Sequence, residues 1–315
     1  MPDTLDEQLT KYLTDVHSIE EQALRQLRTA PKIVGDPELA RTFGDHLIET
    51  EGQERRVRER LEARGADLSK TKDLLGRAGG IGMLLFARSQ PDTPGKLTAH
   101  AFSYEHMEIA AYDLLAIVAD RAGDRETAEV ARSIREQESG MAARLAAGFD
   151  GAVEASSSGQ LTDYLADAHA IEGQAIELLE KGQEIAGQSD LAHVFSDHLD
   201  ETRSHQAVVR ARLEEHDSAP SRLKDAVMRV GALNLGAFFA LQPDTPAKLA
   251  GFAFAFEHLE IGGYEQLRRV AEREGDLETA RVAERIIRDE RAAAAAIHGQ
   301  FDAAMEATLA AQGVA

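Results

Sequence analysis

Residues 101–116 read AFSYEHMEIAAYDLLA, and residues 253–268 read AFAFEHLEIGGYEQLR. In each stretch small and apolar residues surround two glutamates three positions apart, a spacing that puts both carboxylates on one face of a helix. The two stretches belong to a longer repeat, in which residues 8–150 recur without a gap as residues 160–302. A repeat of this length predicts two copies of one domain, each large enough to bury its own core.

The identical positions of the repeat include His106 and Tyr112, which recur as His258 and Tyr264, and a set of five glutamates and one histidine in each half. Many solvated charges, in contrast, differ between the copies. Arg132, for example, corresponds to Glu284. The set that stays the same comprises Glu20, His46, Glu49, Glu105, Glu108 and Glu138 in the first half, and Glu172, His198, Glu201, Glu257, Glu260 and Glu290 in the second. Carboxylates that persist while exposed charges change sign indicate a site.

Hydrophobic spacing predicts an all-α fold of two tandem four-helix bundles. Each bundle has four long helices and a short extra helix in the crossover between the second and third, at 76–86 in the first half. Capping residues followed by proline mark the starts of two long helices, as in Asp36-Pro37. The predicted long helices of the first half cover residues 6–29, 37–64, 93–123 and 124–147.

The repeat also sets the expected domain limits. Residues 1–150 form the first bundle and 160–315 the second, and the glycine- and serine-containing stretch 151–159 is the predicted linker. So short a linker lets the halves pack as an intrachain pseudo-dimer, which we expect to be a monomer or a small homo-oligomer.

Composition restricts the possible partners. A net charge of −20 argues against nucleic acid or an anionic membrane as partner, because both favour basic surfaces. The first residues carry neither a basic nor an apolar signal segment, so we expect a cytoplasmic protein. The absence of cysteine means that any bound metal must be held by oxygen and imidazole.

The recurring glutamates fall on helix faces that otherwise carry apolar residues. Glu20 lies within the Leu13, Val16 and Leu27 stripe, and Glu138 lies within an equivalent stripe on the fourth helix. Buried carboxylates cannot all stay ionised without positive charge, and two divalent cations per bundle would supply it. Oxygen-rich ligation with a few imidazoles favours iron or manganese. The candidate ligands are the set above together with Gln53 and its counterpart His205.

The segments Tyr12-Leu13, His46-Leu-Ile-Glu49-Thr50 and Glu105-His106-Met-Glu108 resemble the YciE/YciF-type ferritin-like family of bacterial stress proteins. The resemblance covers nearly all of both halves. It implies a ferritin-like bundle with a di-iron site, but no well-established enzymatic activity. The Glu-x-x-His motif that is usual in ferritin-like proteins is missing, because residue 52 is Gly and residue 141 is Met. The sequence therefore leaves open whether each bundle binds one metal ion or two.

Three functions therefore remain open for this sequence. The first is iron or manganese binding coupled to oxidant handling in a stress response, such as ferroxidase or peroxide-consuming activity with O₂ or peroxide. The second is a metal buffer without turnover, and the third is a non-catalytic helical scaffold. Because imidazole is a better ligand than a carboxamide, we also expect the half with His205 to bind metal more tightly than the half with Gln53.

Overall fold

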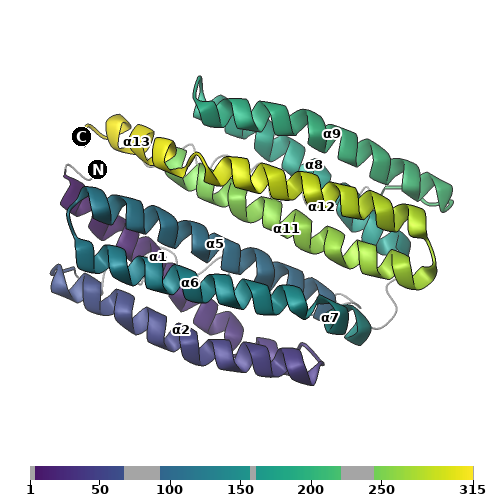
Figure 1. The fold of residues 1–315 in the computed structure, drawn as a ribbon, viewed down its shortest axis with the longest axis horizontal. Helices are drawn as coiled ribbons and strands as arrows, with labels where there is room; N and C mark the ends of the chain where they lie inside the picture. The colour runs from purple at the N-terminus through teal and green to yellow at the C-terminus, as the bar shows by residue number, and fades with distance from the viewer. Residues whose placement is uncertain (1–3, 67–92, 157–160, 221–244, 315) are drawn as a thin grey trace. The chain divides into compact units, whose positions relative to one another are not determined.

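A computed structural model describes residues 4–66, 93–156, 161–220 and 245–314 of the chain. Within these ranges the regular structure is entirely helical. The chain divides into two compact units: unit 1 comprises residues 1–157 with 309–315, and unit 2 comprises residues 158–308. The predicted all-α fold of tandem bundles is confirmed, and the helices are labelled in Figure 1.

Unit 1 is a four-helix bundle in which each long helix packs against two others. The pairs in contact are α1 with α2, α5 with α6, α1 with α5, and α2 with α6. The elements are α1 (Leu5–Leu27), the 3₁₀ turn η1 (Ala30–Lys32), α2 (Pro37–Ala63), α5 (Thr93–Arg121), α6 (Arg125–Ala147) and the short α7 (Phe149–Ala155).

Unit 2 repeats this arrangement. Its packed pairs are α8 with α9, α11 with α12, α8 with α11, and α9 with α12. The elements are α8 (Leu161–Ala186), α9 (Asp190–Glu215), α11 (Thr245–Glu274), α12 (Leu277–His298) and α13 (Phe301–Ala311), of which residues 309–311 are assigned to unit 1.

Side-chain caps set where the long helices begin, as the sequence indicated. Asp36 Oδ1 accepts a hydrogen bond from the Leu39 amide at 2.7 Å, and Pro37 follows as the first helical residue. Asp124 caps α6 and also accepts hydrogen bonds from Arg60, near the end of α2. The same carboxylate thus starts one helix and ties it to the end of its antiparallel neighbour.

The crossover from α2 to α5 joins two helices that run in the same direction. His46, in the first half of α2, lies against Glu105, in the first half of α5. A long connection is needed for this topology because parallel helices cannot be joined by a tight turn. The short helix predicted inside each crossover lies outside the described residues.

A further short helix follows the fourth long helix of each unit, where the sequence indicated a linker at 151–159. In unit 1, residues 149–155 are helical and bury Phe149 and Val153. Gly148 separates α6 from α7, and a Cβ at this position would approach Leu39 Cδ2 to 2.7 Å, so a larger residue would displace the Leu39 side chain. Ser156 then accepts a hydrogen bond from the Gly95 amide at 2.9 Å, which fastens this segment to the start of α5.

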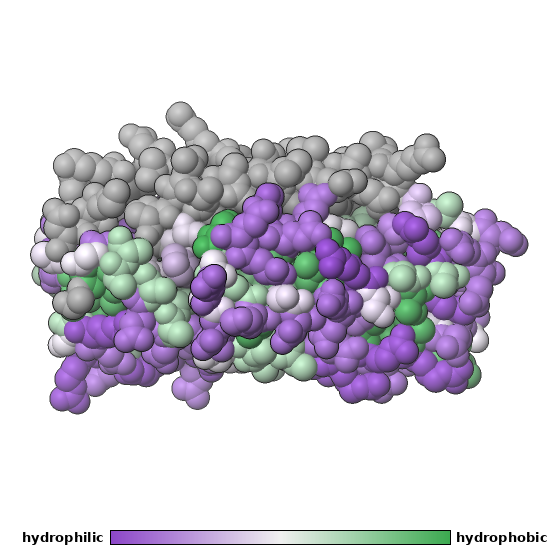
Figure 2. All heavy atoms as spheres, turned by 90° about the horizontal axis from the view of Figure 1, so that it is seen from above, coloured by the Kyte–Doolittle hydropathy of each residue, from purple (hydrophilic) through white to green (hydrophobic). Residues whose placement is uncertain are grey.

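One face of the described residues is predominantly polar. In the view of Figure 2 hydrophilic side chains cover most of the face outside the grey residues, with small hydrophobic areas between them. No helix in the described ranges is both long and apolar enough to cross a bilayer.

Candidate metal centres

The core of each bundle holds a group of buried carboxylates and imidazoles whose ligand atoms lie within 4.8 Å of one another. All four long helices of a unit contribute to it or lie directly beside it. The groups consist of His46, Glu105, Glu108 and Glu138 in unit 1; of His198, Glu257, Glu260 and Glu290 in unit 2; and of Glu172, His205 and Glu290, also in unit 2.

In unit 1 the imidazole of His46 is at the centre of the group. Its Nε2 atom lies 3.3 Å from Glu105 Oε2 and 3.6 Å from Glu138 Oε2. Two ligand atoms each about 2.1 Å from one ion, at right angles, are about 3.0 Å apart, so these spacings suit a shared cation. The fully buried Glu20 belongs to the same site, because its charge acts on both His46 and Glu105.

Unit 2 has the same arrangement with closer contacts and one more imidazole. His198 Nε2 lies 2.9 Å from Glu257 Oε2 and 3.0 Å from Glu290 Oε2. His205 Nδ1 lies 2.9 Å from the other oxygen of Glu290 and 3.8 Å from Glu172 Oε1. Glu290 therefore belongs to both groups of possible ligands in unit 2.

One glutamate in each unit has no partner for either carboxylate oxygen. Both oxygens of Glu108 and both oxygens of Glu260 are inaccessible to solvent and make no hydrogen bond. A buried polar group without a partner is strongly unfavourable, and such groups are rare in folded proteins. Oxygen atoms of this kind, among other carboxylates, fit a hard cation as their missing partner.

Burial dominates the protonation of the carboxylates in unit 1. It raises the pKa of Glu20 to about 8, against the opposing hydrogen bond from Tyr112. Burial and the charge of Glu20 also raise the pKa of Glu108 well above its usual range. Burial would lower the pKa of His46, but the charges of Glu105 and Glu49 and the hydrogen bonds to them together outweigh it and raise that pKa to about 9.

The same forces act in unit 2, where the imidazoles separate the carboxylates into two kinds. Burial raises the pKa of Glu257 to about 8. Burial would also raise the pKa of Glu290, but contact with His198 and His205 lowers it to about 2. Conversely, Glu257 overcomes the effect of burial on His198 and raises the pKa of that imidazole to about 12. Without metal, Glu290 and His198 form a buried ion pair.

A tyrosine in each unit holds one of the glutamates in place. The Tyr112 hydroxyl donates a short hydrogen bond to Glu20 Oε1, and the Tyr264 hydroxyl donates one to Glu172 Oε1. Both rings are buried. Tyr112 and Tyr264 lie one helical turn beyond Glu108 and Glu260 and so share their face, but they were not among the candidate ligands that the sequence indicated.

Glu49 and Glu201 lie outside the buried groups. Glu49 is 36% exposed at its side chain and accepts a hydrogen bond from Arg144. Each residue also contacts the neighbouring histidine: His46 Nδ1 is 3.0 Å from Glu49 Oε2, and His198 Nδ1 is 3.1 Å from Glu201 Oε2. In this position the carboxylate orients the imidazole, leaving Nε2 directed at the other glutamates.

Residues 53 and 205 differ in their surroundings as well as in identity. Gln53 Nε2 donates a 3.4 Å hydrogen bond to Gln137, and its buried Oε1 atom has no partner. His205 uses Nε2 to contact Asp289 at 3.3 Å and directs Nδ1 at Glu290. Of the two, the histidine is the one placed directly among carboxylates.

Three further histidines lie outside the groups. His17 Nε2 pairs with Glu54 at 3.0 Å. His106 Nδ1 donates to the Phe102 carbonyl oxygen at 2.7 Å, and burial lowers the pKa of His106 to about 4. His258 makes the same backbone contact in unit 2.

Comparison with known proteins identifies the repeat. The family described as a domain of unknown function, DUF892, matches the chain twice, over residues 4–158 and 156–310. The chain is similar to Protein YciF of Escherichia coli (strain K12), with 27% identity over 139 residues that cover 43% of this chain and 84% of that protein. No solved structure matches the chain.

Proposed function

The chain belongs to the DUF892 family through both of its halves, and we propose that each unit binds a pair of iron or manganese ions used to handle oxidants. The observation that carries this proposal is the orphaned carboxylate of Glu108, repeated at Glu260. A purely structural core would gain stability by replacing these glutamates, because nothing in the protein compensates for their burial.

The donor set supports two divalent cations in each unit. Unit 2 supplies the carboxylates Glu172, Glu257, Glu260 and Glu290 and the imidazoles His198 and His205. Four carboxylates balance the charge of two divalent ions, and carboxylate with imidazole is the combination that iron and manganese favour in helical bundles. In unit 1 the carboxylates are Glu20, Glu105, Glu108 and Glu138, with His46 as the imidazole.

The residues around these ligands hold them for binding. Glu49 fixes the ring of His46 through Nδ1, so that Nε2 stays available. Tyr112 keeps Glu20 in position through its hydroxyl. Because the site is buried, metal binding displaces protons from the glutamates with raised pKa rather than water from a preformed charged cavity.

When bound, the two ions would supply two electrons, one each, so that O₂ or peroxide could be reduced; with peroxide and two protons the product is two waters. Such a reaction would remove an oxidant, in line with the stress response that the resemblance implied.

Metal stoichiometry tests the proposal. Anaerobic titration with Fe(II) or Mn(II), followed by gel filtration and elemental analysis, should give two ions per unit. Glu108→Gln with Glu260→Gln should lose metal, whereas Glu136→Gln, an exposed glutamate on α6, should keep it. Wild-type protein without stoichiometric metal would favour the scaffold alternative. Metal uptake without Fe(II) oxidation or peroxide consumption would identify a buffer.

A further inference from the structure

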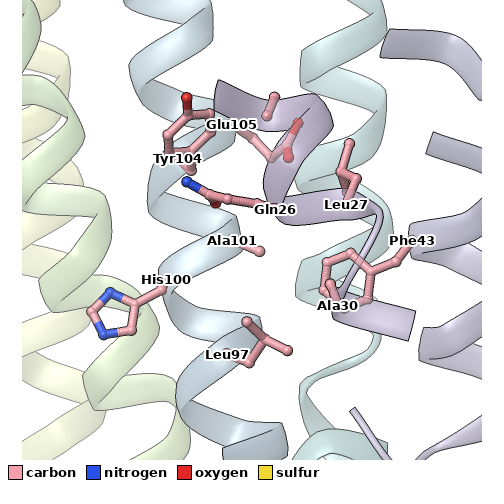
Figure 3. A pocket seen from close by; sticks show the side chains of 10 residues that line it. Gln26, Leu27, Ala30, Phe43, Leu97, His100, Ala101, Tyr104 and Glu105 are labelled. Carbon is pink, nitrogen blue, oxygen red and sulfur yellow. The ribbon is translucent and has the colours of Figure 1, made fainter. Parts of the chain in front are cut away.

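A small pocket in unit 1 reaches the metal-ligand group from the side of α1 and α5. Its volume is about 30 Å³, which is room for one or two molecules of the size of water. Figure 3 shows Gln26, Tyr104 and Glu105 gathered at one end of this pocket, and Leu97 and His100 at the other. Of these residues Glu105 belongs to the candidate metal centre.

The end of the pocket next to Glu105 is polar. Gln26 Nε2 is inaccessible to solvent and has no hydrogen-bond partner. Tyr104 donates its hydroxyl proton to the Ile19 carbonyl oxygen at 3.0 Å, which holds the ring at the pocket wall. A small polar molecule entering here would meet the unused Gln26 donor before it reached Glu105.

The same positions in unit 2 carry apolar side chains. Gln26 corresponds to Leu178, His100 to Phe252 and Tyr104 to Phe256. Leu178 and Phe256 are buried in one hydrophobic cluster, against which Phe252 packs. The ring centroids of Phe252 and Phe256 are 6.3 Å apart.

A further exchange brings another ring into this region of unit 2. Ala30 corresponds to Gly182, where a Cβ atom would approach Phe195 Cδ2 to 2.9 Å. Phe195 therefore packs directly against the helix backbone. Its counterpart Phe43 lines the pocket in unit 1. Moving a polar molecule through such a cluster is unfavourable, because the molecule would lose its hydrogen bonds to water and gain none in return.

We propose that the pocket beside Glu105 is the entry by which a small polar molecule, of the size of hydrogen peroxide, reaches the metal centre of unit 1. The hydrophobic cluster of Leu178, Phe252 and Phe256 closes the corresponding path in unit 2. This inference rests on the proposed function, and it divides that function between the units. Unit 1 is the exchanging centre, and unit 2 keeps its ions away from small polar ligands on this side.

Azide binding to the Co(II)-loaded protein tests the inference without relying on turnover. Azide is a small polar metal ligand, and its binding changes the visible absorption bands of Co(II). Rapid mixing should resolve two phases, a fast one from unit 1 and one at least about tenfold slower from unit 2, because each 1.4 kcal/mol of barrier is a factor of ten. A single phase with both units loaded would overturn the inference.

Exchanging the pocket residues between the units assigns the phases. The triple variant Gln26→Leu, His100→Phe, Tyr104→Phe should convert the fast phase to a slow one. The converse variant Leu178→Gln, Phe252→His, Phe256→Tyr should accelerate the slow phase. Arg132→Glu introduces a unit 2 residue at an exposed position of α6 and should change neither.

Two controls keep the outcome clear. Ala101→Leu narrows the pocket by one side chain and replaces the triple variant if that variant does not fold. A fast phase that survives in a folded, fully loaded pocket variant refutes the inference alone. Protein that takes up no Co(II) refutes the proposed function and the inference with it.

Discussion

Replacing His205 with glutamine should remove most of the difference in metal affinity between the units. The Nδ1 atom of His205 lies 2.9 Å from Glu290 and 3.8 Å from Glu172, so it would complete the second group of unit 2. Gln53 occupies the same position in unit 1, where its amide nitrogen is held by Gln137. His205→Gln therefore gives unit 2 the side chain that unit 1 already has.

The size of the effect follows from the role of the imidazole. Loss of a residue that only supports a ligand lowers metal affinity by about 10–100-fold, so loss of a ligand should reach at least the upper end of that range. A 100-fold change is about 2.7 kcal/mol. His205 is buried, so no solvent-exposed group can take its place without rearrangement of the core.

Anaerobic titration of Fe(II) or Mn(II), followed by calorimetry, measures this difference. Wild-type protein should show a tight and a weaker phase, His205→Gln should lose the tight phase, and Gln53→His should strengthen the weak one. His193→Gln is the matched control, because it makes the same substitution at an exposed position of α9. An unaltered isotherm in His205→Gln would refute the reasoning and leave His205 as a partner of Asp289.

Three other perturbations have expected outcomes. Burial raises the pKa of Glu20 and Glu257 to about 8, so metal must displace protons from them at neutral pH. Calorimetry in buffers of different ionisation enthalpy should detect more protons released per bound ion at pH ~6.5 than at pH ~9. Equal proton release at the two pH values would contradict the assignment of these glutamates as ligands. For the same reason Glu20 and Glu257 should stabilise the metal-free protein most below their unfolded pKa of ~4.3, and this contribution should be lost as pH rises through about 8. Saturating Mn(II), at about 100 times its dissociation constant, should restore about 2.7 kcal/mol, and a thermal midpoint indifferent to chelator in metal-containing protein would count against these ligands. Asp276→Ala should destabilise unit 2 by about 2 kcal/mol in chemical denaturation, because the carboxylate caps α12 and pairs with Arg212, whereas the control Glu278→Ala should leave denaturation unchanged. Burial would raise the pKa of Asp276, but hydrogen bonding, chiefly with Thr279, lowers it. The stability that Asp276 contributes is therefore present above its unfolded pKa and lost on strong acidification.

The repeat and its helical periodicity determined most of the architecture. Each long helix carries an apolar stripe whose spacing is read directly from residue order, and caps such as Asp36-Pro37 locate its start. The glutamates of the buried groups could be found for the same reason, because a charged residue inside an apolar stripe is conspicuous. The extra helix after Gly148 was missed, since its stability comes from burying Phe149 and Val153 rather than from its own short sequence.

Only the tertiary structure decided which polar residues face the site and which lie beside it. Glu49 and His46 are three residues apart on one helix, yet the carboxylate is half-exposed and contacts Nδ1, while Nε2 points into the core. Helical spacing fixes a direction only to within a turn, whereas ligation depends on ångström distances between different helices. The pocket beside Glu105 is likewise a product of packing, because whether Gln26 or Leu178 leaves space depends on the side chains that meet it from α5 or α11.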